Sequence, residues 1–135
     1  MKRSLDLYRD ILLAVESSGT PWDHEGIIVD IQDGFNFRGS EVSVPDSLRE
    51  TKPEILARHA PLLIQAGLLE GDAGKDSKGV SPVVSIFGLA HEGHDFVENI
   101  RDNTVWKKVK EKAASMALEV VKATAKAVVK GAAGV

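Results

Sequence analysis

The sequence contains no cysteine, and this absence excludes several classes of protein at once. A chain without thiols has no disulfide framework, no thiolate zinc site and no cysteine nucleophile. Long hydrophobic runs are also missing, because no stretch approaches the roughly 18 apolar residues that a membrane-spanning helix needs. The basic N-terminus resembles the start of a signal peptide, but Asp6, Arg9 and Asp10 interrupt the apolar run that should follow. We therefore expect a soluble, cytoplasmic protein with no membrane partner.

The balance of side chains excludes disorder and low complexity. Hydrophobic residues make up 43% and charged residues 27% of the 135 residues, which is the ordinary composition of a globular protein. A chain of this length forms one domain and buries a core without covalent cross-links. The composition alone indicates no activity.

The net charge of −3 conceals a polarity along the chain. Residues 1–100 contain 9 Lys and Arg against 17 Asp and Glu, a balance of −8, whereas residues 101–135 contain 8 against 3, a balance of +5. An acidic body with a basic tail indicates that the tail meets something negative. The candidates are the body of a second subunit, a nucleic-acid backbone and an anionic membrane, and the simplest alternative is a solvated lysine face.

Hydrophobic periodicity and turn residues predict both helices and strands. The clearest signal near the N-terminus is a helix on which Leu5, Tyr8 and Leu12 recur at helical spacing. In chain order we expect a helix from Leu5 to about Ser17, strands at Ile27–Ile31 and Phe35–Phe37, a brief helix at Pro45–Glu50, a helix from Thr51 to Ala66 closed by Gly67, strands at Leu68–Glu70 and Val83–Phe87 around a polar loop at Gly71–Gly79, and helices at Leu89–Ile100 and 104–130.

Three hydroxyl side chains, those of Ser4, Thr51 and Thr104, are predicted to cap helices. Thr51 and Glu54 have the spacing of a capping box, in which each side chain satisfies a backbone N–H of the other residue. Pro61 lies inside the helix that follows. It removes one helical hydrogen bond there, so we expect it to kink or shorten the helix.

The order of these elements predicts a mainly α (α+β) fold, a winged helix-turn-helix with a small antiparallel sheet of three strands. In this interpretation the loop at 71–79 is the wing. We expect residues 1–103 to form the winged-helix domain and residues 104–135 to add a C-terminal amphipathic helix.

The terminal helix has the cleanest amphipathic pattern in the sequence. Its apolar stripe consists of Trp106, Val109, Ala113, Met116, Val120, Ala123 and Ala127. About 26 residues at 1.5 Å each span roughly 40 Å, more than a domain of this size can cover. We therefore expect this stripe to pair two copies of the chain in a homodimer, with Trp106 anchoring the helix against the body.

Four groups of segments are distinctive when read together. They are Met1–Leu7 with Ile11–Leu13, Arg58-His59 followed by Leu62-Leu63 and Ala66–Leu69, Leu89–Phe96, and Ile100–Lys108. In these segments the chain resembles an uncharacterised family of bacterial and phage proteins, the domain of unknown function twenty-five thirteen (DUF2513). The resemblance implies a layout similar to MarR-like winged helices, whose recognition helix runs into a Gly-Leu strand as at Gly67-Leu68. Here His91 stands where the family usually has tryptophan, and the family implies no established activity.

DNA binding is the first functional hypothesis. We expect the contacts to come from the recognition helix and the wing, through Arg49, Lys52, Arg58, Lys75 and Lys78. Several carboxylates share this surface, among them Glu54 and Asp72, and only Arg58 and Gln65 project from the helix as base-reading side chains. His59 lies on the apolar stripe, where a hydrogen-bonded core histidine is the expected interpretation.

The second hypothesis belongs to another class. The same fold would serve as an adaptor or inhibitor in phage–host conflict, binding a basic host or phage protein through its acidic surface and binding no DNA. An enzyme is not expected, because the sequence has neither a nucleophile elbow nor a phosphate-cradling glycine loop. His91 and His94 resemble a metalloprotease motif that is one residue short, and we expect no metal or cofactor there.

Overall fold

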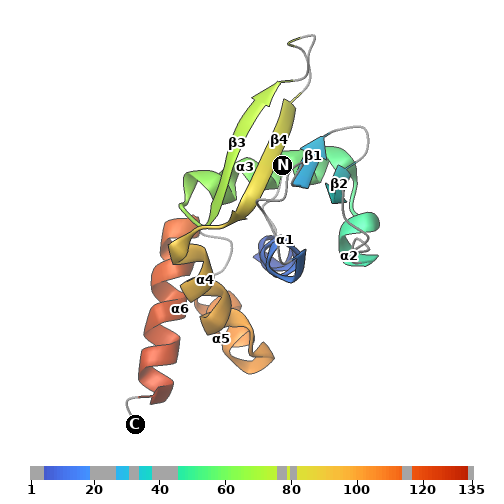
Figure 1. The fold of residues 1–135 in the computed structure, drawn as a ribbon. Helices are drawn as coiled ribbons and strands as arrows, with labels where there is room; N and C mark the ends of the chain where they lie inside the picture. The colour runs from blue at the N-terminus through green and yellow to red at the C-terminus, as the bar shows by residue number, and fades with distance from the viewer. Residues whose placement is uncertain are drawn as a thin grey trace.

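The computed structural model describes residues 5–18, 27–30, 34–37, 46–75, 79, 82–113 and 117–133. Six helices and four strands lie within these ranges (Figure 1). They are α1 (Leu5–Ser18), β1 (Ile27–Asp30), β2 (Gly34–Phe37), α2 (Asp46–Arg49), α3 (Pro53–Gln65), β3 (Leu69–Lys75), β4 (Pro82–Leu89), α4 (His91–Ile100), α5 (Asn103–Ala113) and α6 (Leu118–Ala133). The expected α+β class is confirmed, and among the described helices none is long and apolar enough to cross a membrane.

The described strands form one antiparallel sheet in the order β2-β1-β4-β3. Val29 of β1 lies opposite Val84 of β4, and Ile27 lies opposite Ile86. These side chains are buried against α1 and α3, which pack on the same sheet. The sheet has four strands rather than the three expected, because β2 extends it beyond β1.

The hairpin of β3 and β4 projects beyond the helices (Figure 1). β3 continues to Lys75, so the prediction of a loop from Gly71 onward is wrong for its first five residues. The register with β4 shifts between Glu70 and Gly71, so that Phe87 is the extra residue of a bulge in β4. A Cβ on Gly71 would lie 2.2 Å from the carbonyl oxygen of Ser85, which explains why a glycine continues the strand here.

Two predicted helix caps are wrong. The Thr51 hydroxyl donates to the carbonyl of Ser47 (2.6 Å), and α3 starts after Lys52 without a side-chain cap, so no capping box forms. At α5 the cap is Asp102, whose Oδ1 accepts hydrogen bonds from the N–H groups of Thr104 (2.7 Å) and Val105 (3.0 Å). The third predicted cap, Ser4, lies outside the described residues.

Pro61 does not shorten α3, which continues to Gln65. The helix then ends as predicted at Gly67, whose φ of 78° suits glycine. Proline removes one hydrogen bond, but the buried side of α3 packs against the sheet and α1 and compensates for that loss. Tertiary packing therefore outweighs the local defect.

The C-terminal segment differs most from expectation. The predicted single helix at 104–130 is two helices, α5 and α6, which pack against each other, and α6 also packs against α4 (Figure 1). Buried side chains from both helices belong to the one hydrophobic core cluster of the described residues: Trp106, Val109, Ala113, Leu118, Val121, Ala125 and Val128. The terminal segment thus folds back onto its own chain instead of projecting as a rod.

A close backbone contact joins the start of α4 to the start of the hairpin. The N–H of Ala90 donates to the carbonyl of Leu68 (3.0 Å), and a Cβ on Gly93 would lie 1.9 Å from that same oxygen. Only glycine permits this approach, because real Cβ contacts are never so short.

We predict that Gly93→Ala destabilises the protein by about 1–3 kcal/mol, the usual cost of overpacking. Alanine ordinarily stabilises a helix by up to about 1 kcal/mol relative to glycine. The loss of stability predicted here therefore has the opposite sign to the usual effect of Gly→Ala in a helix. Urea unfolding measures the change. Gly74→Ala is the control, since no atom lies within 4 Å of a Cβ there, and equal effects from both substitutions would contradict the contact.

Candidate functional site

The outward side of α3 is the candidate nucleic-acid surface. Glu54, Arg58 and Gln65 are exposed along it, and Lys52 is exposed directly before it. The opposite side of α3 is buried in the core through Leu56, Ala57, Ala60 and Leu63. This outward side therefore combines two cations, one carboxylate and one amide.

Four of the five predicted DNA contacts are described, and they are distributed over three elements. Arg49 is exposed on α2, where it forms an ion pair with Asp46, and Lys52 and Arg58 lie on the neighbouring α3 segment. Lys75 is the last residue of β3, and Lys78 lies outside the described residues. The structure thus brings the first three residues onto consecutive helices and places Lys75 at the far end of the hairpin.

His59 is a core residue, as the sequence predicts. It is fully buried, its Nδ1 lies 2.8 Å from the carbonyl oxygen of Ile55, and its ring lies 5.1 Å from that of Tyr8. A carbonyl oxygen only accepts, so Nδ1 donates this hydrogen bond. His59 is therefore removed from the candidate binding surface.

Two of the segments that carry the family resemblance, the one near the N-terminus and Ile100–Lys108, meet at the junction where α1 contacts the turn between α4 and α5. Arg9 of α1 donates to the carbonyl oxygens of Ile100 (3.1 Å) and Arg101 (2.9 Å) and to Oδ1 of Asn103 (2.8 Å). The carbonyl groups at the end of α4 therefore receive the donors that a helix C-terminus lacks. Arg101 also forms an ion pair with Glu16 of α1 (2.6 Å). These polar side chains fix the turn between α4 and α5 rather than forming a binding site.

Asp6 fastens α1 to α5 beside this junction. Its Oδ1 accepts hydrogen bonds from Nε1 of Trp106 (2.8 Å) and Nζ of Lys110 (2.9 Å). Partial burial acts to raise the pKa of Asp6, but these two hydrogen bonds and the charges of Lys110 and Arg9 lower the pKa on balance. Trp106 thus anchors its helix to the body, as predicted.

We predict that Trp106→Phe destabilises the protein by about 1–2 kcal/mol at pH 7, because it removes a hydrogen bond to a charged group. The folded-state pKa of Asp6 is lowered, so its stabilisation is present at neutral pH and is lost as the pH falls through that pKa. Chemical unfolding at pH 7 and pH 3 measures both. In an Asp6→Asn background, the cost of Trp106→Phe should no longer depend on pH in this range. In the wild-type background, an equal cost of Trp106→Phe at pH 7 and pH 3 would contradict the interaction.

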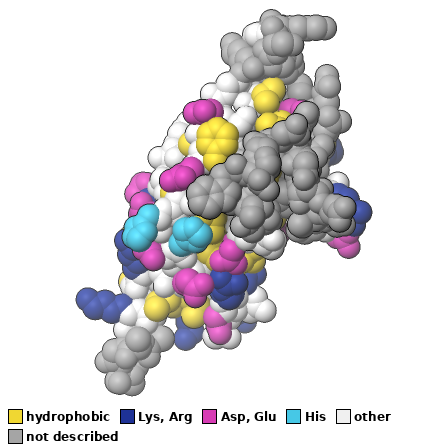
Figure 2. All heavy atoms as spheres, viewed as in Figure 1, with side chains coloured by type: hydrophobic (Ala, Val, Ile, Leu, Met, Phe, Trp, Pro, Cys, Tyr) yellow, Lys and Arg dark blue, Asp and Glu magenta, His cyan; other side chains and the backbone are white. Residues whose placement is uncertain are grey.

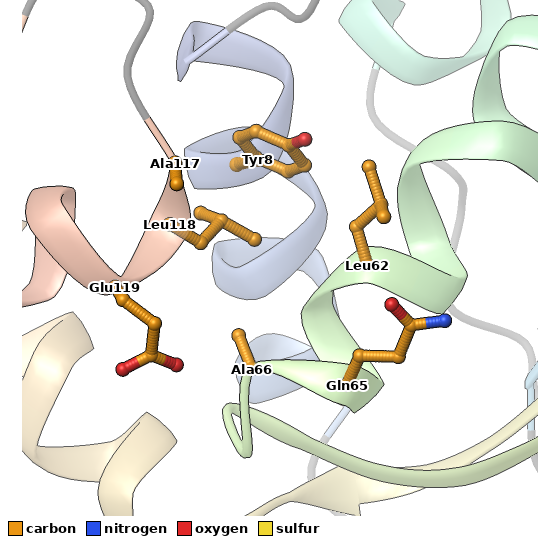
Figure 3. A pocket seen from close by; sticks show the side chains of 7 residues that line it. All are labelled: Tyr8, Leu62, Gln65, Ala66, Ala117, Leu118 and Glu119. Carbon is orange, nitrogen blue, oxygen red and sulfur yellow. The ribbon is translucent and has the colours of Figure 1, made fainter.

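A pocket of about 200 Å³ lies where α1, α3 and the start of α6 meet. Its lining residues are Tyr8, Leu62, Gln65, Ala66, Ala117, Leu118 and Glu119 (Figure 3). Leu118 points into it from α6 and Ala66 points into it from the end of α3 (Figure 3). The walls are mainly apolar, with the Gln65 amide and the Glu119 carboxylate as polar groups. The pocket was not predicted, because it exists only where α6 folds back beside α3.

Lys122 is a buried ammonium that ties three helices together beside this pocket. Its Nζ donates to the carbonyl of Ala66 (2.6 Å) and forms ion pairs with Glu92 (2.8 Å) and Glu119 (3.3 Å). Burial acts to lower the pKa of Lys122, but the two carboxylates raise it on balance, and the same contact lowers the pKa of Glu92. The amphipathic pattern of the sequence gave no indication of the burial of Lys122.

Lys122→Met should cost about 1–3 kcal/mol of stability, because it leaves the buried carbonyl of Ala66 without its donor. Thermal unfolding at equal protein concentration measures the loss. Lys112→Met, on the exposed side of α5, should stay within about 0.5 kcal/mol. Similar losses in the two variants would show that the buried contact contributes nothing.

Six of the seven residues of the predicted dimer stripe are described and fall into two groups. Trp106, Val109 and Ala113 are buried within their own chain, where they belong to the core cluster. Val120, Ala123 and Ala127 are exposed on α6. Met116 lies outside the described residues.

The two histidines of the shortened metalloprotease motif point to solvent. His91 is almost fully exposed, and its Nε2 lies 3.9 Å from Asp95 on the same helix. His94 is also exposed. Among the described residues no group of three potential ligands lies close enough together to hold a metal ion.

Comparison with known proteins places this small α+β protein in a family. The sequence model described as "Hypothetical protein (DUF2513)" matches residues 2–119, and the chain belongs to that family. It is also 29% identical over 133 residues to an uncharacterised protein of Haemophilus influenzae, with 96% of each chain covered. No solved structure matches it.

Proposed function

We propose that the protein is a small, non-enzymatic winged-helix protein of bacterial or phage origin that binds DNA in a regulatory or accessory role. The observation that carries the proposal is topological: α2 and α3 follow each other through a short turn, α3 leads into the β3–β4 hairpin, and β4 pairs with β1. This order supports a winged-helix layout similar to that of MarR-like proteins, in which α3 would be the recognition helix and the hairpin the wing.

The side chains on α3 support a role in the major groove. Arg58 projects from the middle of the outward side, where a guanidinium can contact the O6 and N7 atoms of guanine. Lys52 and Arg49 precede it at the helix start, in position for phosphate groups. The hairpin with Lys75 and Lys78 would reach the backbone beside them. Affinity comes from this small set of cations, so we expect it to be modest.

We predict that binding to a random 20-base-pair duplex weakens with salt at a slope of about −4 in log K against log salt, because four to five phosphate contacts are available. Fluorescence anisotropy between 50 and 300 mM NaCl measures the slope. The double variant Lys75→Ala, Lys78→Ala should reduce the magnitude of this slope by about 2. Arg58→Ala should cost about 1–3 kcal/mol of binding free energy on a preferred duplex selected from random sequences.

The control is Lys107→Ala with Lys108→Ala, which removes the same charge from the exposed side of α5. It should leave the slope unchanged. Absence of binding at 50 mM NaCl would overturn the proposal, and equal losses in the two lysine pairs would show non-specific attraction rather than a winged-helix contact.

An adaptor or inhibitor that binds a basic protein is the second candidate. The observation that favours it is the pair of exposed carboxylates on the projecting β3–β4 hairpin, Glu70 and Asp72. These carboxylates would repel phosphate groups along β3. In this case the same anisotropy titration gives no binding at low salt, and Arg58→Ala changes nothing.

A further inference from the structure

Among the described residues, the sheet presents a partly exposed apolar strip on the side away from α1 and α3. Burial alternates along its central strands, so that Val29 and Val84 face the core while Ile28, Val83 and Phe87 face outward. Phe87 is 47% exposed. A large aromatic side chain in the middle of a sheet is exposed at a cost unless a partner covers it.

Carboxylates border this strip on both sides. Asp30 of β1 lies opposite Val83, and Glu70 and Asp72 are exposed on β3 at the other side of β4. Lys75, at the end of β3, is the one basic residue in the sequence of these three strands. We call these six residues, Ile28, Asp30, Glu70, Asp72, Val83 and Phe87, the outer sheet face. Figure 2 shows acidic side chains gathered around exposed hydrophobic ones over the hairpin and α4.

The exposed side of α6 carries Lys126, Lys130 and Glu119 beside an apolar surface, and Glu119 is paired with Lys122. Val120 is 39% exposed. Among the described residues, Phe87 and Val120 are the two large hydrophobic side chains that are exposed. Ala123 and Ala127 continue from Val120 at helical spacing, and Lys126 and Lys130 flank them. We call these five residues the outer α6 face.

Within its own chain the outer α6 face meets α4 through Lys126, whose charge acts on Glu92. α6 packs on α4 and α5 through its other side, on which Leu118, Val121, Ala125 and Val128 are buried. Small alanine side chains let a helix backbone approach a flat partner closely, and the two lysines beside them can reach carboxylates over a short distance.

We propose that two copies of the chain associate by placing the outer α6 face of each on the outer sheet face of the other. A helix laid on a sheet is a standard packing layer, and here Val120 and the alanines would cover Phe87 while Lys126 and Lys130 meet Asp30, Glu70 and Asp72. Two such contacts related by a twofold axis close a dimer. The occupant is a second copy because the chain itself carries both complementary faces.

Two charge-reversal variants of the full chain test this dimer. The sheet variant carries Glu70→Lys and Asp72→Lys, and the helix variant carries Lys126→Glu and Lys130→Glu. Sedimentation velocity between 1 and 200 μM should show a wild-type dimer that weakens with salt, and each variant alone should dissociate roughly 100-fold more readily, because like charges then face each other.

Mixing the two variants is the decisive measurement. In the mixed dimer one contact has lysines on the sheet and glutamates on the helix, and the other contact is wild type, so both are attractive. The mixture should recover dimer to within roughly 10-fold of wild type. The control Lys107→Glu with Lys108→Glu makes the same charge change on α5 and should leave the dimer intact, and circular dichroism checks that every variant is folded.

Each other outcome overturns the proposal. A wild type that stays monomeric at 200 μM and low salt would leave the outer sheet face to a foreign basic protein. A dimer lost in the helix variant but not in the sheet variant would indicate pairing of α6 with α6. Two folded variants that stay monomeric when mixed would exclude the exchange of faces. None of these results depends on DNA binding, so the two proposals fail separately.

Discussion

Arg9 determines how the C-terminal third of this protein is arranged. A helix that ends inside a protein exposes carbonyl groups that need donors, and Arg9 supplies them to Ile100 and Arg101 at the end of α4. Asp102 caps the next helix within two residues of that point. The chain can therefore turn sharply between α4 and α5 without leaving buried polar groups unsatisfied. Because α5 starts in this direction, α6 returns to the body and comes to lie beside α3 and α4.

The return of α6 creates the features that bear on function. It forms one wall of the pocket between Tyr8 and Leu62, it brings Lys122 to the end of α3, and it leaves a narrow apolar stripe exposed on its outer side. The rod that would have projected from the body becomes a compact helical pair with a surface of its own. The acidic body and basic tail of the sequence are consequently two faces of one domain.

Sequence periodicity predicted α1, α2, α4 and the hairpin because their apolar residues and their glycines are local signals. It failed between Asn103 and Lys130, where no glycine or proline occurs and one amphipathic pattern runs through two helices. The burial of Lys122 could not be predicted from the local sequence either, since its partners Ala66 and Glu92 are distant in sequence. Of the predicted dimer stripe, Val120 is exposed while Trp106 is buried, a difference that the periodicity did not predict. Long-range contacts, which no local pattern encodes, decide each of these cases.

The contact between Lys122 and Ala66 has a consequence for how the protein opens. One ammonium group holds the last turn of α3, the first turn of α4 and the first turns of α6, so none of these ends can fray alone. The three helices should exchange their amide protons as one cooperative unit rather than sequentially. The family model matches residues 2–119, so Ala66 and Glu92 lie within the matched region and Lys122 lies just beyond it.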